Sequence, residues 1–203
     1  KHVKAIVVKF SALSADINQP AHNDVLKQVG PAYNQEIRTL DPKQHRMALV
    51  GTTHLVPIMN EVDLLPIHNF KYGQHPLAAN IGEDVYINKF DRGYDGCWIG
   101  CMVACSHGVN NFELTTGPWK GEKVFVNGPE YETIGLFGPN IGVLDPHKIA
   151  EFNYYCNQYG LDTIPAGSMI GALLETGKYS VSDSGGIEQA VLEILHKITF
   201  REE

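Results

Sequence analysis

The chain has 203 residues, of which 43% are hydrophobic and 19% charged, and this is the composition of a soluble globular protein that can bury a core. Its formal net charge is −7 and no run is rich in lysine or arginine, which argues against a nucleic-acid surface or an anionic membrane as its partner. No apolar run reaches the roughly 20 residues that cross a bilayer, and the opening KHVKAIVVKF lacks the apolar region and cleavage site of a secretory signal.

The first expected element is a strand at residues 4–10, which alternate in pattern and are rich in valine and isoleucine. A single strand leaves both of its edges unpaired, so we expect this strand to have lost the rest of its sheet. The sequence therefore predicts that the chain is a piece of a larger protein.

Two helices are expected next. Residues 23–40 carry apolar side chains at helical spacing, but Gly30-Pro31 predicts that this helix is broken there. Asp41-Pro42 predicts the start of the second helix, because aspartate is a favoured N-cap and proline a favoured first helical residue.

The middle of the chain is rich in glycine and proline. The second helix is expected to run towards Ile58, with Gly51 weakening its middle. Residues 65–90 are predicted to be irregular, and residues 107–130 to be mostly loop, with a short strand at residues 123–127.

The last part of the chain is predicted to be helical. Asp145-Pro146 repeats the helix-start signal, and Gly160 stands where a left-handed residue would end that helix. Further helices are expected at residues 165–175 and 184–198, the last with a clear apolar face. The whole pattern predicts a mainly α-helical fold.

Three of the four cysteines, Cys97, Cys101 and Cys105, are crowded into the segment GCWIGCMVACSHG. Their spacing by four would place them along one stripe of a helix, as in a packed core. The surrounding glycines make a regular helix doubtful, however, and clustered thiolates suit zinc or an iron–sulfur cluster. The spacing alone leaves a redox cluster, a zinc site and core packing open, while the crowding of thiols indicates a reducing, cytoplasmic compartment.

The segment GPEYETIGLFGPNIGVLDPHKIAEFNYYCNQYGLDTIPAGSMIGALLETG, residues 128–177, resembles the tungstopterin-dependent aldehyde ferredoxin oxidoreductase family. The order of the motifs is also that of the family: a cysteine triplet, a G-P-E-Y-E segment and a helix that ends in D-x-x-G-L-D-T. The resemblance implies that residues 1–20 are the end of an N-terminal, α+β pterin-binding domain. Residues 21–203 would then belong to the family's α-helical second domain, incomplete at its C-terminus.

In that family a C-x2-C-x3-C motif supplies three ligands to a [4Fe–4S] cluster beside the pterin. The resemblance assigns these roles to Cys97, Cys101 and Cys105, although this chain has one more residue between the first two. The fourth ligand of the family lies beyond residue 203, and Cys156 stands at a position that is not a ligand in the family.

Two carboxylates occur in the GPEYE segment, Glu130 and Glu132. On an extended strand their side chains would point in opposite directions, so that one faces a cavity. The resemblance places Glu132 beside the tungsten, or molybdenum, where it would act as general base on the water that attacks the aldehyde. The alternative is that both are ordinary polar loop residues.

The segment NQYGLDT is expected to form the end of a helix that turns on its glycine. The resemblance makes Asp162 a ligand of the pterin's N–H edge, with Leu161 and Thr163 beside it, and Asn157 in place of the family's first aspartate. The alternative for Asp162 is N-cap of the following helix. The family's dimer-bridging E-x-x-H motif is here Glu151 to Tyr154, so no metal is predicted at that place.

The predicted function is a tungsten (or molybdenum) bis-pterin and [4Fe–4S] oxidoreductase that oxidises aldehydes to carboxylic acids. Its partners would be a ferredoxin or another iron–sulfur electron carrier and the remainder of the same enzyme, and a homodimer is allowed. Two alternatives stay open: a radical enzyme that uses S-adenosylmethionine and a zinc-stapled binding module without catalysis.

Overall fold

The computed structural model describes residues 7, 9, 19–40, 42–95, 101, 103–182 and 185–201. The chain divides into two compact units, Lys1–Pro42 and Lys43–Glu203. Only Val7 and Lys9 of the strand expected at residues 4–10 are described, and neither is part of a helix or strand. The other residues of that strand, the expected N-cap Asp41, Cys97 and Ser184 lie outside the described residues.

In the first unit, α1 (Gln19–Leu40) is a continuous helix that contains Pro31. The predicted break at Gly30-Pro31 is therefore wrong. Proline removes one backbone N–H donor and crowds the preceding turn. A long helix can lose this one hydrogen bond and keep the others before and after the proline.

The predicted second helix is divided at Gly51. α2 (Pro42–Val50) ends just before this glycine, and the short η2 (Thr52–His54) and α3 (Leu55–Glu61) follow it. Gly51 has a φ of 78°, which a helix cannot contain, so the weak point is a complete interruption.

The segment predicted to be irregular contains two helical elements, η3 (Ala78–Ile81) and α4 (Glu83–Lys89). An ion pair between Arg46 of α2 and Glu83 joins α4 to the second helix of the chain. Glycine and proline in this segment concealed α4, which is only two turns long and depends on such tertiary contacts.

A small antiparallel sheet follows, with the strand order β1-β2-β3. Its strands are β1 (Arg92–Tyr94), β2 (His107–Glu113) and β3 (Lys123–Asn127). The strand at 123–127 is confirmed, whereas the expected loop at 107–113 is wrong. Glycine and asparagine disfavour a strand there, but the strand's own Val109 and Phe112 side chains are buried and hold it in place.

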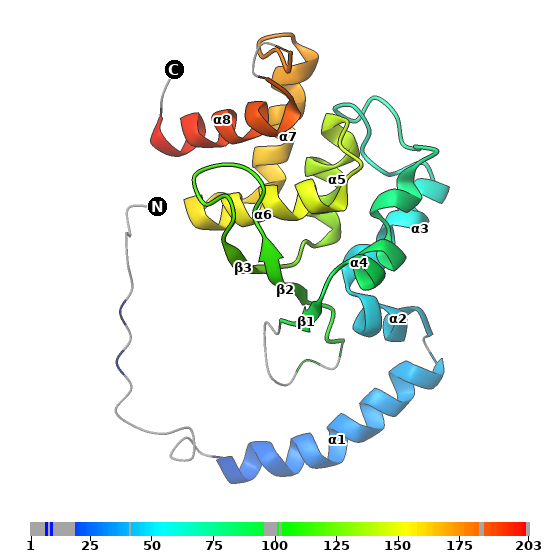
Figure 1. Ribbon diagram of the computed structural model, residues 1–203. Helices are drawn as coiled ribbons and strands as arrows, with labels where there is room; N and C mark the ends of the chain where they lie inside the picture. Colours follow the sequence, from blue (N-terminus) through cyan, green and yellow to red (C-terminus); the bar gives the residue numbers. More distant parts are fainter. Residues whose placement is uncertain are drawn as a thin grey trace. The chain divides into compact units, whose positions relative to one another are not determined.

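The remaining helices pack around the buried side chains of the second unit, with α5 against α7 and α6 against α8 (Figure 1). Their bounds are α5 (Tyr131–Phe137), η4 (Pro139–Ile141), α6 (Pro146–Tyr159), α7 (Thr163–Glu175) and α8 (Ile187–Phe200). The signals predicted for α6 are confirmed, because the Asp145 side chain accepts a hydrogen bond from His147 N and Gly160 is left-handed with a φ of 67°. The predicted α7 and α8 are confirmed with starts shifted by two and three residues.

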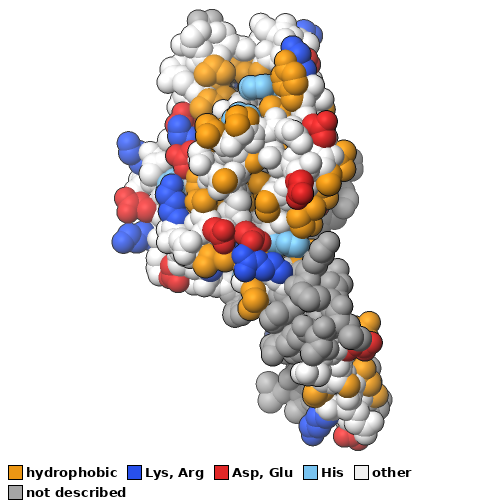
Figure 2. All heavy atoms as spheres, turned by 90° about the vertical axis from the view of Figure 1, so that its right-hand side faces the viewer, with side chains coloured by type: hydrophobic (Ala, Val, Ile, Leu, Met, Phe, Trp, Pro, Cys, Tyr) orange, Lys and Arg blue, Asp and Glu red, His pale blue; other side chains and the backbone are white. Residues whose placement is uncertain are grey.

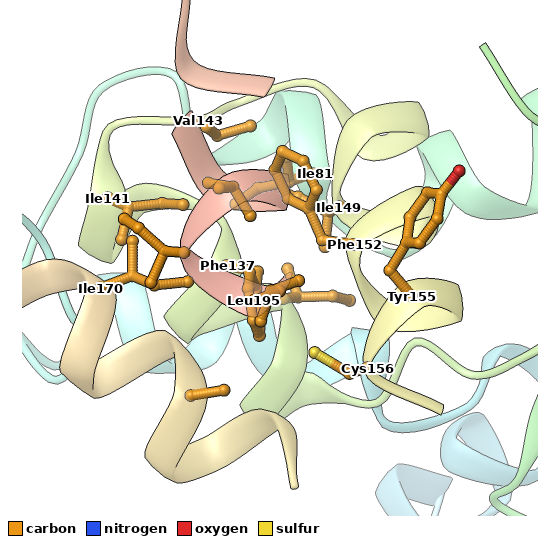
Figure 3. Close-up of a cluster of buried hydrophobic side chains, with 14 of the residues drawn as sticks. Ile81, Phe137, Ile141, Val143, Ile149, Phe152, Tyr155, Cys156, Ile170 and Leu195 are labelled. Carbon is orange, nitrogen blue, oxygen red and sulfur yellow. The ribbon is translucent and has the colours of Figure 1, made fainter. Parts of the chain in front are cut away.

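Fully buried side chains from several of these helices form the main core (Figure 3). Phe137 of α5, Phe152 of α6 and Leu195 of α8 are each 0% exposed. Cys156 also belongs to this cluster, and Figure 3 shows its sulfur pointing toward the hydrophobic side chains. The predicted mainly α-helical fold class is confirmed.

Hydrophobic side chains also reach the surface on the face seen in Figure 2, which is the right-hand side of Figure 1. The loop after α3 contributes exposed side chains such as Leu64 and Phe70. Within the described part of the chain, no helix has both the length and the hydrophobicity needed to cross a membrane.

Candidate functional site

A pocket of about 390 Å³ lies where β3 leads into α5 and where α6 turns into α7. Side chains from separate parts of the sequence line it together. The lining residues are Ser106, Asn127, Gly128, Glu130, Glu132, Thr133, Asn153, Asn157, Leu161, Asp162, Thr163 and Ile164. The pocket thus brings together all five residues predicted for catalysis and pterin binding, from Glu132 to Thr163.

One wall is formed by two asparagines of α6 that hold the end of β3. Asn153 Nδ2 donates to the carbonyl oxygen of Asn127, and Asn157 Nδ2 donates to the Asn127 side-chain oxygen. Sequence reasoning missed Asn127 and Asn153. Asn153 and Asn157 are four residues apart, which places both on one helix face. This spacing is a signal that could have identified Asn153.

The chain then enters α5 through Gly128-Pro129, and the GPEYE segment is not the extended strand that we expected. Glu130 is the N-cap residue of α5, and Glu132 lies in the first turn of the helix. The two carboxylates therefore do not point to opposite sides of a strand. Both line the pocket, with Glu132 exposed and Glu130 half-buried.

The half-buried carboxylate of Glu130 is held by hydroxyl groups. Thr52 Oγ1 donates to Glu130 Oε2 and accepts from Tyr131 N at 2.9 Å. Ser106 also forms a side-chain hydrogen bond with Glu130. Burial raises the pKa of Glu130 above its ordinary value, the Thr52 hydrogen bond opposes this, and the neighbouring charge of Glu132 adds to it.

Asp162 is the N-cap of α7, as the alternative interpretation proposed. Its Oδ1 accepts from Ile164 N at 2.9 Å, and the residue also lines the pocket. Next to it, the Thr163 hydroxyl lies 2.8 Å from the Thr133 hydroxyl of α5. The backbone bond from Leu161 N to the Cys156 carbonyl, 2.8 Å long, closes the turn that presents these residues.

The cysteine segment approaches the pocket at its end. Cys97 lies outside the described residues, whereas Cys101 and Cys105 are both partly exposed. Ser106, the residue after Cys105, lines the pocket. Among the described residues, no three His, Cys, Asp or Glu side chains are grouped as a metal site.

Gly51 packs against the end of the cysteine segment. A Cβ on this glycine would lie 3.1 Å from His107 Nδ1 and 3.2 Å from both the Cys105 carbonyl oxygen and Arg92 Nη2. His107 is buried, and its Nδ1 is 3.2 Å from the Cys105 carbonyl oxygen. Burial lowers the pKa of His107, so the imidazole is neutral near pH 7.

Arg92 is another residue that sequence reasoning missed. It is half-buried in β1, with its guanidinium 5.8 Å from the centre of the Tyr86 ring and 3.5 Å from the carbonyl oxygens of Gly128 and Val50. Burial lowers the pKa of Arg92, and its charge also acts on Glu130.

Cys156 and Glu151 are both engaged elsewhere. Cys156 is 0% exposed, and burial raises the pKa of its thiol to about 12, which makes it a poor metal ligand at neutral pH. Glu151 accepts hydrogen bonds from the backbone and the hydroxyls of Thr115 and Thr116.

Comparison with known proteins gives one family. The family described as aldehyde ferredoxin oxidoreductase, domains 2 & 3, matches residues 28–203. A tungsten-containing aldehyde ferredoxin oxidoreductase of Pyrococcus furiosus is 34% identical over 125 residues, which are 62% of this chain and 19% of that protein. The enzyme of the same description from Pyrococcus horikoshii is 31% identical over 164 residues, 75% of this chain and 25% of that protein.

A further relative is named for a different substrate. The aliphatic sulfonate oxidoreductase, WOR-like subunit, of Pyrococcus furiosus is 30% identical over 149 residues, which are 68% of this chain and 22% of that protein. The chain thus spans about a fifth to a quarter of the length of the curated relatives that it matches.

Proposed function

Because the chain belongs to the aldehyde ferredoxin oxidoreductase family, we propose that it is part of a tungsten enzyme that oxidises aldehydes to carboxylic acids. The electrons would leave through an iron–sulfur cluster to a ferredoxin-like carrier. The observation that carries this proposal is the pocket itself, which gathers the carboxylates of Glu132 and Asp162 beside the residue that follows Cys105.

The pocket fits the edge of a pterin by the chemistry of its donors and acceptors. Its described lining includes three carboxylates and three asparagine amides, and none of its lining residues is lysine or arginine. Such a lining favours a group that presents N–H donors over a phosphate, and the pterin edge presents two parallel N–H groups. Asp162 would accept these, with Asn157 as an additional partner and Leu161 and Thr163 beside them.

The cysteines would hold the [4Fe–4S] cluster through Cys97, Cys101 and Cys105. Cys101 and Cys105 are both partly exposed, as metal-binding thiols must be before loading. The position of Ser106 in the pocket lining would keep such a cluster close to the pterin.

When bound, a tungsten bis-pterin supplies the two-electron redox centre, and the cluster passes the electrons singly to the carrier. This chain would contribute the proton chemistry. A carboxylate oxygen of Glu132, exposed in the pocket, would take a proton from the water as its oxygen adds to the aldehyde carbon. The overall change, aldehyde and water to carboxylic acid, releases two protons and two electrons.

No observation on the described residues favours the radical S-adenosylmethionine enzyme or the zinc-stapled module.

The substrate needs a direct test, since one relative is named for aliphatic sulfonates. The whole enzyme that contains this chain is therefore to be purified without oxygen, analysed for tungsten, iron and zinc, and assayed with aliphatic aldehydes and a viologen dye.

We expect tungsten and iron, with aldehyde-dependent reduction of the dye. Glu132→Gln should retain both metals and lose about 10²- to 10⁴-fold in kcat, the usual range for a general base. The matched control is Glu61→Gln, an exposed glutamate on α3. Zinc alone, or full activity in Glu132→Gln, would contradict the proposal, and metal loading without aldehyde turnover would contradict the substrate.

A further inference from the structure

Glu130 lies where three separate segments of the chain meet. Glu130 is the N-cap residue of α5, and its carboxylate accepts a hydrogen bond from Thr52 of η2. Ser106, at the end of the cysteine segment, also bonds to this carboxylate. These partners are 78 and 24 residues away in the sequence, so Glu130 joins parts that local structure does not hold together. None of the residues assigned to catalysis or pterin binding makes this connection.

The neighbours of Glu130 are themselves fixed. Thr52 Oγ1 donates to the carboxylate and accepts from Tyr131 N, so the orientation of its single proton is determined. The preceding residue, Gly51, packs against the Cys105 carbonyl oxygen and His107. Gly51 therefore packs against the Cys105–Ser106 segment, and Glu130, held by Thr52, forms a hydrogen bond to the same segment through Ser106.

The charge of Glu130 also acts at this junction. The carboxylate is half-buried, and the guanidinium of Arg92 influences it without a direct ion pair among the described residues. An anion at such a place would act on any redox centre bound by the adjoining cysteine, because partial burial weakens the screening by water.

We propose that Glu130 is a positioning residue that fixes the Cys105–Ser106 segment against the pocket and sets the electrostatic environment of the cluster held there. This inference rests on the proposed function. It separates the two glutamates of the GPEYE segment: Glu132 acts on the substrate, whereas Glu130 acts through Ser106 on the cluster.

The test compares Glu130→Gln, Glu130→Ala and Glu132→Gln in the whole enzyme. Glu130→Gln can keep the hydroxyl hydrogen bonds but lacks the charge, so we expect normal iron content, a KM within about twofold, a kcat lowered about tenfold and a more positive cluster midpoint potential. Glu130→Ala should lose iron as well. Glu132→Gln should leave the potential and the electron paramagnetic resonance spectrum of the cluster unchanged.

A readout without metals comes from hydrogen exchange of the metal-free protein. Glu130→Ala should speed exchange in the peptide that spans residues 103–110, while Glu130→Gln and Glu61→Gln should leave it protected. Ser106→Ala removes the same contact from its other partner. It should change the midpoint potential and the electron paramagnetic resonance spectrum of the cluster and speed exchange in the same peptide, so the contact can be tested even if Glu130→Ala fails to fold.

Unchanged potential and spectrum in both Glu130→Gln and Ser106→Ala, together with unchanged exchange in Ser106→Ala, would overturn the inference. Absence of iron from the wild-type enzyme would instead overturn the proposed function. The two failures are therefore distinguishable.

Discussion

The loop between β2 and β3 and the edge of the pocket are each organised by a glutamate, and the two glutamates are held differently. Glu151 is 1% exposed and accepts four hydrogen bonds from Thr115 and Thr116, two of them from backbone N–H groups. Glu130 is half-buried, has hydroxyl partners and lines a pocket. A carboxylate has about four acceptor sites, and in Glu151 all of them are occupied, so Glu151 is a structural anchor. The Glu130 carboxylate can still respond to a bound group.

The largest effect on stability is expected at the anchor. Glu151→Ala removes the acceptor of four hydrogen bonds, so the free energy of unfolding should fall by about 2–4 kcal/mol. Urea unfolding of the 203-residue chain measures this change. Glu151→Gln, which keeps one oxygen acceptor, should lose less, and exposed Glu61→Ala should change it by under about 0.5 kcal/mol. Equal losses in Glu151→Ala and Glu61→Ala would show that the loop does not depend on this carboxylate.

A pair of glycines sharpens the comparison between the two regions. Gly51 near the cysteine segment and Gly121 in the β2–β3 loop both have positive φ, 78° and 89°, but a Cβ meets close atoms only at Gly51. Gly51→Ala should therefore destabilise by about 2–3 kcal/mol and Gly121→Ala by about 1 kcal/mol. Thermal unfolding of both variants tests this order, and equal shifts would mean that backbone strain alone matters.

The pH dependence of stability should identify the half-buried carboxylate. Burial raises the pKa of Glu130 in the folded protein, so the folded state binds this proton more tightly than the unfolded state. Relative to Glu130→Gln, the wild type should lose stability as the pH rises from the ordinary carboxyl range through the raised folded pKa, and the difference should be constant above it. Urea titrations across this range measure the difference, and one that is flat or of opposite sign would rule out a raised pKa.

The smallest effect is expected in thiol reactivity, which is measured on the metal-free folded protein without any substitution. With its pKa raised to about 12 by burial, Cys156 should resist iodoacetamide at pH 8, while the partly exposed Cys101 is alkylated. Peptide mass spectrometry before and after unfolding in urea provides the comparison. Rapid labelling of native Cys156 would mean that the core around it opens readily.

Much of the helical side of the pocket could be predicted from the sequence. Asp145-Pro146 and Gly160 mark both ends of α6, and the residues directly after Gly160 line the pocket. The opposite side could not be predicted in the same way. β2 has a sequence that disfavours strands, and the GPEYE segment was expected to be extended although it begins a helix.

The sequence by itself determined the features that are local in origin: helix caps, apolar periodicity and the family motifs with their order. Only the tertiary structure decided that Glu130 rather than Glu132 is the half-buried carboxylate, and that Ser106, Asn127 and Asn153 share one pocket. The physical reason is distance along the chain. Burial and hydrogen bonding at Glu130 depend on Thr52, 78 residues away, and no pattern within a few residues of the glutamate encodes that contact.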